Sequence, residues 1–160
     1  MPIEPTIIQK PGFTVVGIHV TTSPLASDIP ALWGTFGPRI DEVVSIAEPN
    51  VSYGLMENFD TLKNTLDYMA AVSVTGTDNI PSGMIARSLE PATYAVFQAK
   101  LRTLGEVFGQ IFNEWLPSAS FEQVQAPYFE RYDESFDPSN AESTVEIYIP
   151  VKPRSASADA

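Results

Sequence analysis

Residues 143–152 read STVEIYIPVK, and the alternation in this stretch decides the fold class. Successive side chains of a strand point to opposite faces, so Ile147 and Ile149 share one face while Glu146 and Tyr148 share the other. The aliphatic face requires a covering element, and a helix is the usual partner of such a sheet. The stretch therefore predicts an α+β fold with helices on one face of a sheet and a mixed face left over.

The preceding strand candidate, APYFERYDE at residues 126–134, places a carboxylate between two tyrosines. If the last two strands pair, Tyr148 approaches Glu130 on the helix-free side of the sheet. The expected surface comprises Tyr128, Glu130, Tyr132, Glu146 and Tyr148. Aromatic ring faces and a partly desolvated carboxylate both attract cations, which favours an organic cation as the ligand. The alternative is purely structural, with tyrosines serving the strand and Glu130 paired with an arginine or exposed to water.

The rest of the chain predicts two helices among several strands. Strands are expected at 12–22, 52–58, 66–76 and 91–101 in addition to the last two, and helices at 29–47 and 103–118. The first strand should end in a turn at TTSP, residues 21–24. Pro38 should split the first helix, and Pro117 should stop the second, because proline removes a backbone hydrogen bond.

This order of elements repeats as strand, helix, strand, strand in each half of the chain. A shift of 77 positions lays ENFD at 57–60 on ESFD at 134–137, which is a weak echo at the level of letters. We expect two duplicated units related by a pseudo-twofold axis.

Composition limits the classes of function. The 160 residues include no cysteine and one histidine, His19, so thiol chemistry is absent and no cofactor or metal is expected. The net charge of -11 disfavours direct binding to nucleic acid. The sequence contains neither a signal peptide nor a run of about 18 apolar residues, which predicts a cytoplasmic protein without a membrane partner. Residues 1–152 are expected to form one domain and 153–160 a disordered tail.

Several motifs together resemble the GyrI-like small-molecule-binding domain, the effector-binding domain of multidrug-responsive regulators of the AraC and MerR families. They are VVGI at 15–18, IPALWGTF at 29–36, YGL at 53–55, PATYAVF at 91–97, IFNEWLPSAS at 111–120, PYFERY at 127–132 and EIYIPVK at 146–152. The resemblance extends over about residues 11–152.

The resemblance implies two facing units with a ligand cleft between them, and bulky, often cationic aromatic ligands. The family's glutamate corresponds to Glu130, and the tyrosine of its last-strand motif to Tyr148. Other candidates for the cleft are Tyr53, Trp33, Tyr128, Tyr132, Phe36 and Tyr94. For Phe36 and Tyr94 core packing is the alternative, and Trp115 belongs to the core-facing stripe of the second helix.

One departure from the regulators concerns DNA binding. Only about ten residues precede the matching region, so we expect a stand-alone sensor domain that reaches DNA, if at all, through a protein partner with a DNA-binding module. Two alternatives stay open. Some GyrI-like proteins resemble hydrolases that open strained electrophiles. If this chain is such a hydrolase, Glu130 would act as its general base. The branch that gives the family its name inhibits DNA gyrase by binding it, so the second alternative is a protein-binding inhibitor of this type.

Overall fold

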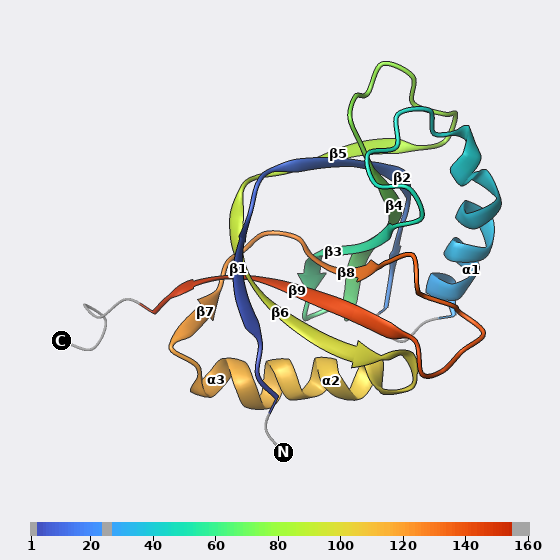
Figure 1. The fold of residues 1–160 in the computed structure, drawn as a ribbon. Coiled ribbons are helices and arrows are strands. Elements are labelled where there is room, and N and C mark those ends of the chain that lie inside the picture. The colour runs from blue at the N-terminus through green and yellow to red at the C-terminus, as the bar shows by residue number, and fades with distance from the viewer. Residues whose placement is uncertain (1–2, 24–26, 155–160) are drawn as a thin grey trace.

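The computed structural model describes residues 3–23 and 27–154 (Figure 1). Its elements in chain order are β1 (Thr6–Lys10), β2 (Phe13–Thr22), α1 (Asp28–Phe36), the 3-10 helix η1 (Gly37–Glu42), β3 (Ser52–Asp60), β4 (Thr65–Val74), β5 (Ile85–Leu89), β6 (Ala92–Lys100), the 3-10 helix η2 (Leu101–Thr103), α2 (Leu104–Gln110), the π-helix η3 (Ile111–Trp115), α3 (Leu116–Ser118), β7 (Phe121–Gln123), β8 (Tyr128–Tyr132) and β9 (Thr144–Pro153). The α+β class predicted from the sequence is confirmed.

The strands form one antiparallel sheet in the order β1-β6-β9-β8-β3-β4-β2-β5, with β7 added beside β9. Both helices lie on the same face of this curled sheet (Figure 1), which we call the helix face. It carries Val72, Phe97 and Ile147, whereas the reverse face carries Phe129 and Tyr148.

Each helix covers its own part of the helix face. Phe36 of α1 is fully buried against β2 and β4, and the helix ends where Pro38 begins the tighter 3-10 turn. Val107 of α2 and Ile111 of η3 pack on the aliphatic side of β9, which includes Ile147. The predicted division of STVEIYIPVK into a helix-covered aliphatic side and a mixed side is thus confirmed.

The first helix is shorter than predicted. The chain beyond Glu42 is extended at Val43, and Ile46 forms an isolated bridge with Val74. Backbone bonds from Ala47 to Ser73 and from Thr75 to Ser45 secure this segment beside β4. The prediction of helix up to residue 47 was therefore wrong, because sheet pairing outweighs helical spacing there.

Other expectations differ in detail. The second helix extends to Ser118 as predicted, with a π-helical turn in its middle and Pro117 inside its last segment. Three short strands, β1, β5 and β7, were not predicted. The turn expected at residues 21–24 includes Pro24, which lies outside the described residues.

The strand order bears on the predicted duplication. Strands β6, β8 and β9 belong to the half of the chain that contains α2, and β2, β3 and β4 belong to the half that contains α1. The two groups meet where β3 pairs with β8. This order is compatible with two related units, while their common origin stays a prediction.

At the C-terminal end of the described chain, Pro153 belongs to β9 and Arg154 donates side-chain hydrogen bonds to the carbonyls of Ala119 and Leu116. These two residues of the predicted tail are therefore held, and residues 155–160 lie outside the described part. None of the helices within 3–23 and 27–154 is both long and apolar enough to cross a membrane.

Candidate functional site

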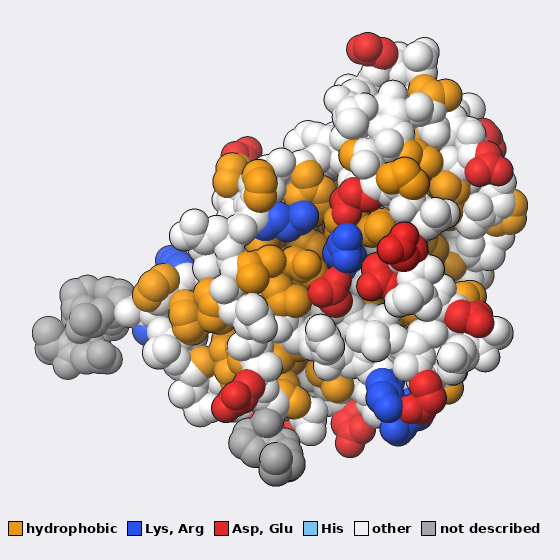
Figure 2. Space-filling model, viewed as in Figure 1, with side chains coloured by type: hydrophobic (Ala, Val, Ile, Leu, Met, Phe, Trp, Pro, Cys, Tyr) orange, Lys and Arg blue, Asp and Glu red, His pale blue; other side chains and the backbone are white. Residues whose placement is uncertain are grey.

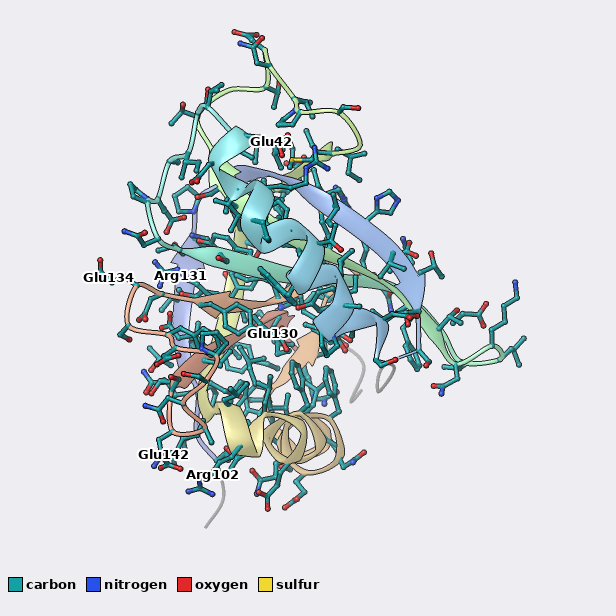
Figure 3. The ribbon with its side chains drawn as sticks, turned by 90° about the vertical axis from the view of Figure 1, so that its right-hand side faces the viewer. Glu42, Arg102, Glu130, Arg131, Glu134 and Glu142 are labelled. Carbon is teal, nitrogen blue, oxygen red and sulfur yellow. The ribbon has the colours of Figure 1, made fainter. Side chains whose placement is uncertain are left out.

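A cleft of about 800 Å³ opens on the helix face between α1 and α2, above β3, β4 and β8. This volume lies within the range typical of small-molecule pockets. Its lining is mostly apolar and comprises Ile29, Pro30, Met56, Phe59, Leu66, Tyr68, Leu104, Gly105, Phe108, Phe112, Asn113, Gln123, Tyr128 and Glu130. Figure 3 shows Glu130 between the two helices, whereas Arg131 points away from them.

Aromatic side chains form one wall of the cleft. Phe108 and Phe112 project from the helix that covers β9, and their ring planes are nearly parallel. The ring of Phe112 meets that of Tyr128 at a centroid distance of 5.7 Å. A planar apolar ligand would therefore meet ring faces and edges on this side.

Glu130 is the charged group of the cleft, and its residue is only 7% exposed. The hydroxyls of Tyr68 and Tyr132 both donate to Oε1, at 3.0 and 2.5 Å. Trp33 of α1 in turn donates its Nε1–H to the Tyr68 hydroxyl at 2.9 Å. This chain orients the two tyrosine protons toward a single carboxylate oxygen.

The other oxygen of Glu130 is left available. Within the described chain, Oε2 accepts no hydrogen bond and Glu130 forms no ion pair. Oε2 is nevertheless not a fully buried orphan atom, so it retains access to the cleft. No lysine or arginine is among the cleft-lining residues of the described segments.

Burial raises the pKa of Glu130, and the hydrogen bonds from Tyr132 and Tyr68 oppose that shift only in part. Burial, together with the nearby Glu130 charge, raises the pKa of both tyrosines well above the ordinary value. The tyrosines therefore keep their protons and act as donors at neutral pH. A carboxylate in this position lacks a positive partner, which is costly for a buried charge.

The backbone of β3 makes room for this arrangement at Gly54, which pairs with Glu130 across the two strands. A Cβ atom at Gly54 would overlap the hydroxyl of Tyr68 and lie 2.8 Å from Oε1 of Glu130. Glycine is therefore required here for close approach of the two side chains to the strand.

The predicted site residues divide between the two faces of the sheet. Glu130 and Tyr128 line the cleft, and Trp33 and Tyr132 contact its hydrogen-bond chain. Phe36 is fully buried beneath α1, with its ring 6.1 Å from that of Trp33.

The expected surface that joins Tyr148 to Glu130 is wrong. In the β8–β9 pair, Glu130 lies opposite Ile147, and Tyr148 lies opposite Phe129. Directly opposed residues of an antiparallel pair share a face, so Tyr148 is on the reverse face. The same face carries Tyr53 and Tyr94, whose rings pack around Phe129.

Tyr68, the second donor to Glu130, was not predicted as a site residue, although a strand was expected at its position. One feature of the sequence pointed to Tyr68: it lies among apolar residues of a buried strand, where its hydroxyl requires a hydrogen-bond partner. Phe108 and Phe112 lie within the helix predicted at residues 103–118, and their place at the cleft was not predicted.

Comparison with known proteins identifies the family. The model of the GyrI-like small molecule binding domain matches residues 3–152, so the chain belongs to this family and the resemblance found in the sequence is confirmed. The transcriptional regulator BrlR of Pseudomonas aeruginosa is 31% identical over 148 residues, which are 91% of this chain and 54% of BrlR. The chain thus spans about half the length of this relative.

Two solved structures have the same fold. SAV2435, in a structure bound to tetraphenylphosphonium, matches with a TM-score of 0.70 and 22% identity over 94% of each chain. The C-terminal domain of EcmrR matches with a TM-score of 0.69 and 15% identity over 96% of this chain and 99% of that domain.

Proposed function

We propose that this member of the GyrI-like family binds amphipathic, cationic aromatic molecules in the cleft, with Glu130 as the counter-charge. The observation that carries the proposal is the free Oε2 of a carboxylate that is 7% exposed and has no cationic partner in the described chain. An organic cation in the cleft would supply the missing positive charge while its apolar body contacts Phe108, Phe112 and Tyr128.

The chemistry of the lining favours cations without specific hydrogen-bond donors. Apolar and aromatic side chains dominate the cleft, and polar groups other than the Glu130 cluster are few. Such a site holds a ligand by charge and contact area and tolerates variation in shape. The likeness to a structure bound to tetraphenylphosphonium supports this class of ligand, since that ion is a bulky aromatic cation.

A regulatory role would divide the work between modules. BrlR is a transcriptional regulator of about twice the matched length, so the domain proposed here would supply the ligand-binding part. The net charge of this chain, -11, repels the phosphate backbone of DNA. Contact with DNA would therefore come from a separate module or a partner protein.

The test is a titration of the wild type and Glu130→Gln with tetraphenylphosphonium and with neutral triphenylphosphine oxide. Tryptophan fluorescence or calorimetry monitors the binding of each compound. Loss of the counter-charge should cost roughly 1 to 3 kcal/mol for the cation, or about fivefold to 150-fold in affinity, and little for the neutral compound. Glu134→Gln is the matched control, since Glu134 is exposed and outside the cleft lining.

Equal losses for the two compounds in Glu130→Gln would overturn the charge argument. Affinity for the cation should also fall as the pH drops through the raised pKa of Glu130, because the protonated carboxyl offers no charge. The ligand should be recovered unchanged by mass spectrometry, and an altered ligand would favour hydrolysis over binding.

A further inference from the structure

A second hollow lies on the reverse face of the sheet, beside the beginning of β1. It has a volume of about 480 Å³ and is separated from the cleft by the sheet itself. Its lining includes Glu4, Thr6, Ile8, Val96, Glu146 and Tyr148. We call it the β1 groove. Figure 2 views this side, where hydrophobic side chains surround a small group of acidic and basic ones.

Tyr148 gives the groove a polar group without a partner. Its residue is 8% exposed, and its ring stacks on Phe129 at a centroid distance of 4.7 Å and an angle of 16°. Within the described segments its hydroxyl takes part in no hydrogen bond, and it is not sealed from the groove. The hydroxyl is therefore open to the groove, where water or a ligand can supply its hydrogen bond.

Glu146 adds a carboxylate with one oxygen in use. Arg131 donates to Oε1 at 3.0 Å, and Oε2 has no hydrogen-bond partner in the described chain. The Glu146 side chain is 25% exposed and lines the groove, as does the exposed carboxylate of Glu4. No lysine or arginine belongs to the described lining, and the carboxylates of Glu146 and Glu4 offer acceptors beside the aliphatic Ile8 and Val96. Arg131 offsets part of the Glu146 charge from outside the groove and leaves Oε2 open.

We propose that the β1 groove is a second ligand site, specific for small protonated aliphatic amines. The ammonium group would donate to Oε2 of Glu146 and to the hydroxyl oxygen of Tyr148, and the hydrocarbon part would rest on Ile8 and Val96. Its chemistry differs from that of the cleft, because a quaternary aromatic cation has no N–H to donate to Glu146 and Tyr148, whereas a protonated primary amine has three.

The probe is cyclohexylmethylammonium, titrated into the 15N-labelled protein at neutral pH and followed by amide chemical shifts, with cyclohexylmethanol as the neutral match. The amine should saturate a site that perturbs amides of β1, β6 and β9. The alcohol should bind at least roughly fivefold more weakly, because it lacks the charge that Glu146 recognises.

Variants locate the site. Tyr148→Phe removes only the unpaired hydroxyl and keeps the stacked ring, so we expect about threefold to tenfold weaker amine binding with an unchanged melting temperature. Thr6→Trp fills the groove from an exposed strand position and should abolish binding. Ile7→Trp is its matched control, because Ile7 lies next to Thr6 on the other face of β1 and is outside the groove.

The result that would overturn the proposal is absence of saturable binding, or binding that survives Thr6→Trp. Loss of amine binding in Glu130→Gln, with amide shifts around α1 and α2, would place the amine in the cleft and likewise refute a separate site. Unchanged amine binding in Glu130→Gln together with weaker binding in Tyr148→Phe and none in Thr6→Trp would establish the groove, whatever the cleft binds.

Discussion

Glu48 and Glu130 lie on opposite sides of the sheet and differ in their hydrogen-bond and ion-pair partners. On the reverse side, Glu48 accepts hydrogen bonds from Tyr53 at 2.7 Å, Ser73 at 2.8 Å and Arg131 at 3.0 Å. Partial burial raises the pKa of Glu48, but these three partners outweigh it and leave the pKa below its ordinary value. On the helix side, Glu130 has hydroxyl donors alone, and burial keeps its pKa raised.

The difference originates in adjacent residues of β8. Glu130 and Arg131 point to opposite faces of the sheet (Figure 3). Arg131 therefore pairs with Glu48 and Glu146 and not with Glu130. One face balances its charges internally, and the other leaves a negative charge beside a cleft. The balanced face holds Glu48 and Glu146 with Arg131, whereas Glu130 on the other face has no cationic partner within the described chain.

Removal of Arg131, the cation that Glu48 and Glu146 share, should lower the stability of the protein more than any other change considered below. In Arg131→Met, Glu48 and Glu146 lose their common partner, while the methionine retains much of the apolar volume. Because both partly buried carboxylates then lose their ion-pair partner and only Lys10 remains nearby, we expect a loss of about 2 to 4 kcal/mol in the free energy of unfolding. Urea denaturation at neutral pH measures it.

Arg102→Met is the matched control for that experiment. Arg102 pairs with Glu142, but both side chains are 54% exposed, so their ion pair should contribute at most about 1 kcal/mol. If the two arginine variants are equally stable, Arg131 does not hold the balanced face together.

The second prediction concerns the support of Glu130. In Gly54→Ala, the new methyl group meets the hydroxyl of Tyr68 and Oε1 of Glu130, so the side chains must move apart. We expect a loss of about 1 to 3 kcal/mol in stability and weaker binding of tetraphenylphosphonium. Calorimetric melting and the fluorescence titration measure these effects.

Gly76→Ala serves as its control, because a Cβ at Gly76 meets nothing within 4 Å. An unchanged affinity in Gly54→Ala would mean that the tyrosine chain does not position Glu130 for a ligand.

The contrast also explains how far the sequence could lead. Alternation in STVEIYIPVK and helical spacing are local properties, and they predicted the sheet, its covering helices and the split at Pro38. Glu130 was singled out because a carboxylate between two tyrosines is unusual in a strand.

Pairing register was not predictable from the same information. A shift of one residue exchanges the faces of a whole strand, and nothing local places Tyr148 opposite Phe129. Short edge strands such as β1 and β5 lack a distinct pattern and form by pairing with β6 and β2. The role of Tyr68 depends on a contact with Glu130 across 62 positions of sequence, which alternation alone does not reveal.

The smallest expected change in stability is that of Glu130→Gln, which should stabilise the protein, whereas the other substitutions destabilise it. Because the pKa of Glu130 is raised by burial, the folded state holds this proton more tightly than the unfolded chain does. The resulting stabilisation is fully present below the unfolded pKa and is lost as the pH rises through the folded one. At neutral pH, Glu130→Gln should therefore stabilise the protein by about 1 kcal/mol, while Glu134→Gln changes little.

Thermal melting as a function of pH tests this sign. The advantage of Glu130→Gln over the wild type should shrink in acid, where the native carboxyl regains its proton, and a variant less stable than the wild type at neutral pH would contradict an unbalanced charge. Saturating tetraphenylphosphonium should reverse the order, because a cation that binds only the folded wild type adds stability through mass action. A stability cost that only a cation removes is the signature expected of a carboxylate kept for binding rather than for the fold.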